Sequence, residues 1–577
     1  MSRALKISIG QHSDKGRKEI NQDFHGALIP EQPLLGSKGI AIALADGISS
    51  SNVSAIASES AVKGFLTDYY CTSESWSVKT SAQRVIAATN SWLHSQTRRS
   101  RHAYDKDKGY VCTFSVMVLK STTAHIFHIG DSRIYRVAGH SLEQLTNDHR
   151  VAVSSAQTYL SRALGMDTHT EIDYRMVPLE KGDVFVLATD GVYEYAGDRF
   201  LAAAVHDLRH DLDAAAKTVV KEAYNRGSPD NLTVQIVRID ALPDGEASEL
   251  LGPASELPLP PLLEARMIFD GYRIVRQVHA SSRSHIYLAV DIESNDVVII
   301  KIPSIDLRGD PAYLKRFMME EWVARRINSP YVLKAPAPSR KRNYLYVVTE
   351  FVDGQTLTQW TIDNPKPDLE TVRGIVEQIA KGLRAFHRME MLHQDLRPEN
   401  IMIDKTGTVK IIDFGSVNVT GVMEATPSAD PGQILGTAQY TAPEYFVGEG
   451  GTPRSDLFSL GVITYQMLTG RLPYGAQMAR ARTKSQQRKV LYSSVTNGEI
   501  PAWMDGAIRK AVHPDPGKRY GELSEYIYDL RHPNENFLKA SPAPLIARYP
   551  LLFWQVACFI LFCVIFVLLA NQIGPHG

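Results

Sequence analysis

Residues 241–266 divide the chain into two parts with different sequence patterns. This segment reads ALPDGEASELLGPASELPLPPLLEAR, and it contains several Pro, Glu, Ser and Ala residues but no aromatic residue. Such a composition is typical of a semi-rigid linker. The chain has 577 residues, which is too long for a single hydrophobic core. We therefore expect a first domain over residues 1–240 and a second over residues 267–533.

Short apolar runs in the first part lie next to acidic residues. Three of them end just before an aspartate and a fourth begins just after one; these aspartates are Asp46, Asp131, Asp190 and Asp230. Such runs predict buried strands, and residues 55–69 and 212–224 are expected to be helical. Because strands hold their ends rigidly, these aspartates can converge. The pattern indicates an α+β sandwich with sheets inside and helices outside.

Converging carboxylates favour a divalent cation, because the charges repel one another until a cation enters. Hard ions such as Mg²⁺ and Mn²⁺ prefer carboxylate and carbonyl oxygens, and two ions can activate one water for hydrolysis of a phosphate ester. The motifs Asp46-Gly47, Gly130-Asp131-Ser132-Arg133, Asp190-Gly191 and Asp230-Asn231 resemble the PPM family of metal-dependent protein phosphatases, type 2C. The resemblance covers residues 5–240 and implies an αββα sandwich.

The resemblance also implies a role for each acidic residue in binding two or three Mn²⁺ or Mg²⁺ ions. Asp46 would bridge two metals with the Gly47 carbonyl beside it, Asp190 and Asp230 would hold the second metal, Asp23 would orient a metal-bound water, and Asp131 would hold a third, weaker ion. At the position of the phosphate-binding Arg of the family stands Lys18, with Arg17 beside it. A lysine is a point charge rather than a bidentate fork, so a weaker hold on phosphate is expected.

A second set of motifs follows in order after the linker. The main blocks are Val298-Ile299-Ile300-Lys301, His393-Gln394-Asp395-Leu396-Arg397-Pro398-Glu399-Asn400, Asp413-Phe414-Gly415 and Ala442-Pro443-Glu444. Their order and spacing resemble a Hanks-type protein kinase over residues 270–532. The resemblance implies a two-lobed fold that binds ATP and Mg²⁺ and transfers a phosphoryl group mainly by positioning and charge neutralisation.

The kinase resemblance assigns roles residue by residue. Lys301 would bind the α- and β-phosphates and pair with Glu320, which the spacing favours over Glu321. Asp395 would accept the proton of the substrate hydroxyl, with Arg397 near the γ-phosphate and a Thr437 hydroxyl nearby that implies Ser/Thr specificity. Asn400 and Asp413 would hold Mg²⁺. The ATP site would also include Val278, Ile286 and the backbone at Glu350 and Val352. Arg519 would pair with Glu444.

Two departures from the kinase pattern affect the expected activity. The loop between Val278 and Ile286 contains no glycine, so its side chains hinder a close approach of backbone to phosphate. Gln394 replaces the Arg that commonly binds a phosphate on the activation loop, which predicts activity without that phosphorylation. We expect weak or slow use of ATP. A pseudokinase that senses ATP or acts as a scaffold is the alternative.

Residues 551–570 read LLFWQVACFILFCVIFVLLA and contain no charge. A helix of this length can cross the hydrocarbon core of a bilayer, although a buried core helix is the alternative. Arg548 precedes the run and no Lys or Arg follows it. This asymmetry predicts a single-pass helix in the cell (inner) membrane, with residues 534–550 as a juxtamembrane linker and both domains in the cytoplasm.

The sequence as a whole predicts a bifunctional α+β multidomain signalling enzyme that acts on protein Ser/Thr and phosphoSer/phosphoThr. Lys and Arg together number 63, as do Asp and Glu, so the net charge is zero and no nucleic-acid partner is expected. Two further expectations are that the phosphatase domain dephosphorylates the kinase domain of the same protein and that the chain forms a dimer. His125 and His128 alternate on a strand near Asp131 and are expected to be packed strand residues rather than ligands.

Overall fold

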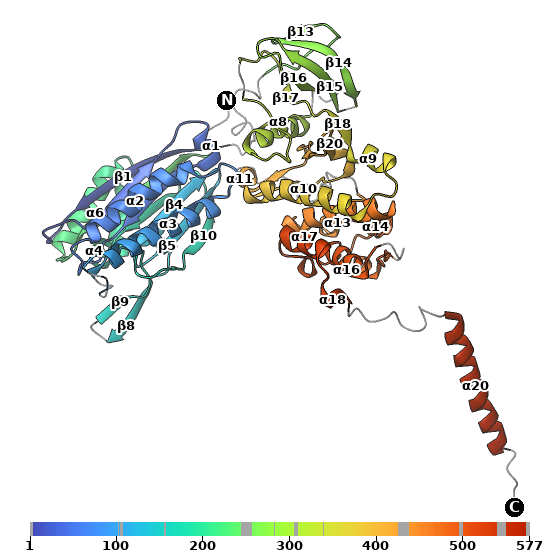
Figure 1. Ribbon diagram of the computed structural model, residues 1–577. Coiled ribbons are helices and arrows are strands. Elements are labelled where there is room, and N and C mark those ends of the chain that lie inside the picture. The colour runs from blue at the N-terminus through green and yellow to red at the C-terminus, as the bar shows by residue number, and fades with distance from the viewer. Residues whose placement is uncertain are drawn as a thin grey trace, which may run out of the picture.

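The computed structural model describes residues 4–101, 103, 105, 108–154, 157–243, 257–281, 283–304, 310–337, 340–424, 438–495, 500–538 and 550–572. Two folded domains are followed by a helix at the C-terminal end (Figure 1). The first domain ends with a strand at Ala241, and the second begins its sheet at Ile268.

The first domain contains two five-stranded antiparallel sheets packed face to face. One sheet has the order β1-β12-β11-β6-β7 and the other β10-β5-β4-β3-β2. Their bounds are β1 Lys6–Asp14, β2 Phe24–Leu28, β3 Ile40–Ala45, β4 Phe114–Lys120, β5 Thr123–Ile129, β6 Arg133–Ala138, β7 Ser141–Gln144, β10 Asp173–Pro178, β11 Val184–Ala188 and β12 Leu232–Ala241. A separate hairpin is formed by β8 Arg150–Ser154 and β9 Gln157–Leu160.

Helices cover the outer faces of both sheets (Figure 1). Their bounds are α1 Leu34–Lys38, α2 Ser54–Cys71, α3 Val78–Arg99, α4 Asp190–Ala196, α5 Asp198–Asp207 and α6 Leu212–Asn225. α2 and α3 pack on the β4 sheet, and α4 to α6 pack on the β12 sheet. The predicted αββα sandwich is therefore found, and the two helices expected from the sequence correspond to α2 and α6.

The alternation of side chains along β3 shows why this sandwich has three apolar layers. Ile40, Ile42 and Leu44 lie between the two sheets, whereas Ala41 and the next two alanines in the strand face the helices. All are fully buried. Because successive residues of a strand point to opposite faces, the uniformly apolar run fits a strand that is covered on both sides.

The second domain has a strand-rich lobe and a helical lobe. Among the described residues, the first lobe has the sheet order β13-β14-β15-β16-β17 and one helix. Its elements are β13 Ile268–Phe269, β14 Tyr272–Ala280, β15 Ser284–Asp291, β16 Val297–Pro303, α8 Pro311–Arg326 and β17 Val347–Glu350. Its sheet packs a core of its own, while α8 also contributes Val323 and Ala324 to the core of the helical lobe.

The helical lobe is built around α10 and α13, with short strands at the side facing the first lobe. Its longer helices are α10 Leu369–Arg388, α13 Pro453–Thr469, α16 Ala502–Ala511 and α17 Leu523–Arg531. The shorter ones are α9 Leu357–Asp363, α11 Thr420–Met423, α12 Pro443–Phe446, α14 Gln477–Arg480, α15 Lys484–Lys489 and α18 Glu535–Leu538, with single 3₁₀ turns at Pro398–Asn400 and Pro516–Lys518. The strands are β18 Gly354–Thr356, β19 Met391–Leu392, β20 Ile401–Asp404, β21 Val409–Ile411 and β22 Asn418–Val419. This is the two-lobed arrangement that the sequence predicts.

The last described element is α20 (Pro550–Gln572), which stands apart from the two domains (Figure 1). Among the residues that the structure describes, no helix combines the length and the apolarity needed to span a membrane. The expected transmembrane helix stays a prediction.

Candidate functional sites

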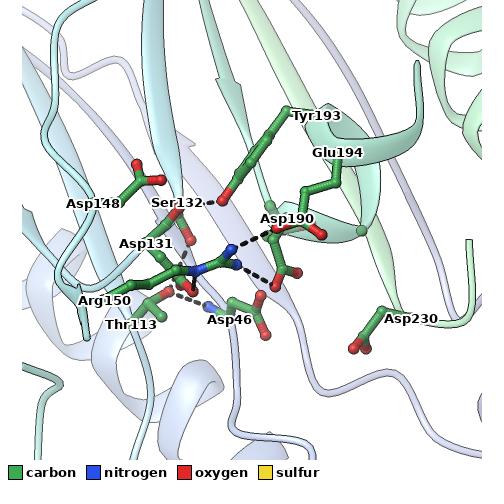
Figure 2. A network of polar contacts seen from close by, with 12 residues as sticks. Asp46, Thr113, Asp131, Ser132, Asp148, Arg150, Asp190, Tyr193, Glu194 and Asp230 are labelled. Atoms are coloured by element: carbon green, nitrogen blue, oxygen red, sulfur yellow. Dashed lines mark hydrogen bonds and ion pairs between the residues drawn. The ribbon is translucent and has the colours of Figure 1, made fainter. Parts of the chain in front are cut away.

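An acidic cavity of about 450 Å³ opens at one end of the sandwich. Its acidic lining consists of Asp46, Asp131, Asp190, Glu194 and Asp230, and Gly47 also lines it. The aspartates come from the ends of different strands: Asp46 follows β3, and Asp190 lies just beyond β11. The structure thus brings together the predicted residues that are far apart in sequence (Figure 2).

Asp23 is not one of the residues that line the cavity. Its carboxylate is buried, and Thr189 Oγ1 donates a hydrogen bond to Asp23 Oδ2 at 3.0 Å. The other oxygen, Oδ1, has no hydrogen-bond partner among the described residues. Burial raises the pKa of the Asp23 carboxyl, and the nearby Asp230 carboxylate adds to this. A buried carboxylate oxygen without a donor fits a role in holding a water or an ion.

The two predicted phosphate-binding cations lie in different places. Lys18 points to the cavity, where its Nζ is 3.3 Å from Asp230 Oδ1 and donates to Ser49 Oγ at 2.8 Å. Arg17 instead donates to the backbone carbonyls of Ser228 and Tyr224, outside the cavity lining. Of the two, only Lys18 is placed to meet a ligand beside the acidic cluster.

Arg150 is a cavity residue that the sequence interpretation did not identify. It is the first residue of β8, and its guanidinium lies 2.5 Å from Asp131 Oδ2, 2.9 Å from Asp190 Oδ2 and 2.5 Å from Glu194 Oε1 (Figure 2). No motif surrounds it, and charge alone does not distinguish it from the other arginines of the chain. Only the fold of the β8–β9 hairpin places this cation among the carboxylates.

The electrostatics of the cavity favour a cation. Burial raises the pKa of the Asp46 carboxyl well above its usual range, and Asp23 and Asp190 raise it further. Burial and the Asp131 carboxylate likewise raise the pKa of Asp190. The structure shows no group of three or more His, Cys, Asp or Glu side chains in metal-binding geometry within its described residues. Arg150 and Lys18 supply positive charge among these carboxylates, and the crowded carboxylates together with the unpartnered Asp23 Oδ1 fit a divalent ion.

The two strand histidines are packed residues, as the sequence predicts. His128 Nδ1 is 2.9 Å from Ser115 Oγ, and its Nε2 is 2.9 Å from the Gly130 carbonyl. His125 Nδ1 is 2.9 Å from the Tyr174 hydroxyl. Burial lowers the pKa of both histidines to about 4. They are therefore neutral at physiological pH and serve the hydrogen bonding of the sheet.

In the second domain, a lysine and a glutamate meet between β16 and α8. Lys301 Nζ lies 2.6 Å from Glu320 Oε2, so the choice of Glu320 over its neighbour Glu321 is confirmed. Burial lowers the pKa of Lys301, but the Glu320 and Asp413 carboxylates outweigh this and raise it overall. The lysine is therefore a fixed positive charge beside Asp413.

Asp456 of α13 supports the predicted catalytic loop, which is the motif of residues 393–400. Its carboxylate accepts hydrogen bonds from the backbone N–H groups of His393 and Gln394, each at 3.0 Å. Within the loop, Asn400 Nδ2 donates to the Asp395 carbonyl at 2.9 Å and to Asp395 Oδ2 at 3.2 Å, and Arg397 Nε is 3.6 Å from that Oδ2. The predicted residues Asp395, Arg397 and Asn400 thus form one cluster. Thr437 lies outside the described residues.

Asp413 and the backbone at Glu350 and Val352 are the remaining residues of the predicted ATP site. Asp413 Oδ1 accepts the Gly415 N–H at 3.0 Å, and its pKa is lowered because Lys301 offsets the effect of burial. The Glu350 N–H donates to the Lys334 carbonyl at 2.9 Å, so this N–H is not available to a ligand. Val352 is buried.

The glycine-free loop forms the turn between β14 and β15. Val278 on β14 is half exposed, and Ile286 on β15 lies opposite His279. The loop is tied to its surroundings, because the Arg283 carbonyl accepts hydrogen bonds from the Tyr313 hydroxyl of α8 and from the Ser304 N–H. These two hydrogen bonds hold the loop in place.

A buried ion pair joins two distant parts of the helical lobe. Arg519 and Glu444 form a bidentate contact with distances of 2.8 and 2.7 Å, and their side chains are 0% and 3% exposed. The pair predicted from the sequence is confirmed. It fixes α12, which begins within the Ala442-Pro443-Glu444 motif, to the loop before α17.

Comparison with known proteins gives one family for each domain. Residues 11–234 match the family model of protein phosphatase 2C, and residues 272–529 match that of the protein kinase domain. The serine/threonine-protein kinase PrkC of Bacillus subtilis is 28% identical over 271 residues, which are 47% of this chain and 41% of PrkC. PknA of Corynebacterium glutamicum is 30% identical over 269 residues, or 45% of this chain and 55% of PknA.

Among solved structures, the serine/threonine phosphatase PstP/Ppp of Mycobacterium tuberculosis has a TM-score of 0.35 and 20% identity, and the match covers 41% of this chain and 100% of that chain. The chain spans about two fifths of the length of PrkC. The two family models match separate parts of the chain, on either side of the 241–266 segment. This chain is therefore an α+β multidomain protein in which a domain similar to protein phosphatase 2C is followed by a domain similar to the protein kinase domain.

Proposed function

We propose that the chain is a bifunctional signalling enzyme, which phosphorylates Ser and Thr residues of proteins with ATP and hydrolyses phosphoserine and phosphothreonine. The observation that carries the kinase activity is the pairing of Lys301 with Glu320 at 2.6 Å beside Asp413. The observation that carries the phosphatase activity is the group of aspartates around one cavity.

In the kinase domain, the described residues are placed to bind ATP and to aim a hydroxyl group. Lys301 would bind the α- and β-phosphates, and the Glu350 carbonyl and the Val352 backbone would bind adenine, with Val278 and Ile286 as further residues of the ATP site. Asp395 accepts the proton of the attacking hydroxyl, while Arg397 stabilises the γ-phosphate. Asn400 and Asp413 would hold Mg²⁺, which neutralises phosphate charge when bound. Thr437 is proposed to orient the hydroxyl-bearing substrate.

In the phosphatase domain, the cavity carboxylates would hold two or three Mn²⁺ or Mg²⁺ ions. Asp46 with the Gly47 carbonyl, Asp190 and Asp230 are proposed for the two main ions, Asp131 for a third, and Asp23 for orienting a water. Such ions lower the pKa of a bound water and supply a nucleophile at neutral pH. Lys18 and Arg150, which stand among these carboxylates, are placed to attract the phosphate of the substrate.

A pseudokinase that only senses ATP is the alternative for the second domain. The glycine-free loop favours it, but the intact Lys301–Glu320 pair and the similarity to Ser/Thr kinases favour catalysis. The two are separated by incubating the purified full chain with labelled ATP and a generic protein substrate. We expect phosphate transfer above that of Asp395→Asn and Asp413→Ala proteins. Transfer equal to that of both variants would leave the pseudokinase function standing.

The phosphatase activity is tested separately with p-nitrophenyl phosphate. Hydrolysis is expected to require Mn²⁺ or Mg²⁺ and to be lost in Asp46→Ala protein. Self-dephosphorylation is tested with the same variant under Mg-ATP, where we expect more phosphate on the Asp46→Ala chain than on wild type. Equal phosphate content would exclude the kinase domain as a substrate of its own phosphatase domain.

We also propose that α20 anchors both domains on the cytoplasmic side of the cell (inner) membrane. Residues 551–570 carry no charge, and described side chains such as Phe559 and Phe562 are each 68% exposed. Exposed apolar side chains of this density favour burial in lipid. The full chain should remain in the membrane fraction after alkaline carbonate extraction, whereas residues 1–538 should be released. Release of the full chain would exclude an integral anchor.

A further inference from the structure

Within the described part of the chain, the phosphatase domain contacts the kinase domain at a short segment and at a buried lysine. The segment, residues 73–80, joins α2 to the first turn of α3, and we call it the docking segment. The lysine is Lys120, the last residue of β4. On the kinase side, α11 lies at the junction of the two domains (Figure 1).

The first contact is with the start of the activation segment, which follows Asp413-Phe414-Gly415. The Gly421 N–H donates to the Ser75 carbonyl at 3.0 Å, and the Val78 N–H donates to Glu424 Oε2 at 2.9 Å. Lys120 Nζ donates to the Gly421 carbonyl at 2.6 Å and lies 3.3 Å from Glu424 Oε2. The Lys120 side chain is 1% exposed, so the charge of Glu424 compensates an otherwise isolated buried cation.

The fit at Gly421 is so close that no other residue has room there. A Cβ atom at this position would lie 2.6 Å from the Trp76 carbonyl oxygen and 2.8 Å from the carbonyl oxygens of Glu74 and Ser75. These are backbone atoms that cannot rotate away. The activation segment is therefore packed directly against the backbone of the docking segment.

The second contact is with the turn before the catalytic loop. Glu390 accepts hydrogen bonds from the Ser77 N–H at 2.7 Å and from Thr80 Oγ1 at 2.6 Å, and Trp76 Nε1 donates to the Arg388 carbonyl at 2.9 Å. Glu390 has a left-handed backbone with φ of 53°. A non-glycine residue keeps such a conformation only where its surroundings hold it. The strand β19 begins directly after Glu390 and leads into the catalytic loop.

The third contact is with α8, the helix that carries Glu320. Arg326, its last residue, lies 2.6 Å from Glu74 Oε2 of the docking segment. The docking segment therefore touches the end of α8, the turn before the catalytic loop and the activation segment. These three elements carry or adjoin the groups whose relative positions decide whether a kinase is active.

We infer that the phosphatase domain is a built-in activating partner of the kinase domain, with the docking segment and Lys120 as positioning elements for α8, the catalytic loop and the activation segment. In many kinases an Arg before the catalytic aspartate orders the activation segment by binding a phosphate on it. Here Gln394 occupies that position, and Lys120 holds the carboxylate of Glu424 instead. This inference rests on the proposed kinase activity.

The test is a charge exchange at the rim of the contact, where the side chains of Arg326 and Glu74 are 30% and 27% exposed, so substitution is expected to leave the fold intact. Glu74→Arg and Arg326→Glu each place like charges together, and the double variant restores the attraction. We expect each single variant of the full chain to lower the kinase kcat about tenfold with little change in KM for ATP, and the double variant to recover most of this loss. Lys120→Met should have a similar effect to the single variants.

Phosphatase activity and an unrelated surface variant serve as controls. Hydrolysis of p-nitrophenyl phosphate should stay unchanged in all these variants, because Lys120 lies at the opposite end of β4 from Thr113, which lines the cavity. Glu143→Arg, which alters an exposed ion pair away from the contact, should change neither activity. Absence of kinase activity in wild type would refute the proposed function. Active wild type with unchanged or increased kcat in the single variants, or no recovery in the double variant, would overturn the inference alone.

Discussion

Replacing Arg150 by alanine is expected to tighten the binding of Mn²⁺ to the phosphatase cavity. The guanidinium makes close ion pairs with Asp131 at 2.5 Å and Asp190 at 2.9 Å, both proposed metal ligands. A metal ion that binds these oxygens has to displace the arginine. The wild-type protein therefore loses the ion pairs of Arg150 when it binds metal, whereas the variant has no such ion pairs to lose.

The size of this effect follows from the contacts that are lost. A hydrogen bond to a charged group contributes about 1.5–3 kcal/mol, and the arginine is 24% exposed, which places its net effect toward the lower end. Displacement of one to two such bonds corresponds to a change in Kd of about ten- to a hundredfold. We therefore expect Arg150→Ala to lower the Kd for Mn²⁺ by this factor.

The measurement is isothermal titration of the metal-free full chain with Mn²⁺ at fixed pH and ionic strength. Arg175→Ala is the matched control, because this arginine pairs with Glu143 outside the cavity lining and should leave the Kd unchanged. An Arg150→Ala protein with the wild-type Kd, or with weaker binding, would refute the competition between guanidinium and metal. The same variant should also show a higher KM for p-nitrophenyl phosphate, because a cation near the phosphate is lost.

Three further predictions concern stability and positioning. Arg519→Met leaves the buried Glu444 carboxylate without its counter-ion, with only the Ser455 hydroxyl still donating to it, so it should destabilise the kinase domain by about 3–5 kcal/mol in chemical denaturation; an unchanged midpoint would contradict this. Asp456→Asn weakens the support of the catalytic loop and should lower the kinase kcat about a hundredfold while p-nitrophenyl phosphate hydrolysis persists; a parallel loss of both activities would point to unfolding instead. Burial lowers the pKa of His125 and His128 to about 4 from the usual 6.5, so the unfolded chain takes up more protons as pH falls from about 6.5 to about 4, and the free energy of unfolding decreases through that window. His125→Phe should remove about 3 kcal/mol of this decrease in pH-dependent denaturation, and an unchanged pH profile would show that the histidine does not titrate as described.

Much of the fold could be predicted because its signals are local. An apolar run such as residues 40–45 is long enough for one strand, and the aspartate after it marks the strand end. In the kinase domain, the spacing of motifs was sufficient to choose Glu320 over Glu321, and the resemblance to protein kinases implied the pairing of Arg519 with Glu444. Both predictions rest on short motifs typical of the protein kinase family, and the structure confirms both pairs.

Other features could not be predicted because they depend on which surfaces pack together. Lys18 and Arg17 are neighbours with the same charge, yet only Lys18 lies close to Asp230. Arg17 instead donates hydrogen bonds to the backbone carbonyls of Ser228 and Tyr224. Arg150 lies in a hairpin without a motif, and its carboxylate partners come from other elements of the domain. A sequence pattern gives the charge of such residues but not the direction in which they point.

The sequence by itself determined the chemical groups, their order and the two domains that contain them, because strand and helix periodicities and short motifs are properties of neighbouring residues. The tertiary structure alone decided how the two domains meet. Lys120 of a phosphatase strand pairs with Glu424 of the kinase activation segment, and the backbone of residues 74–76 closes on Gly421. The physical reason is that burial of charge and close backbone packing depend on distances in space between residues that lie hundreds of positions apart.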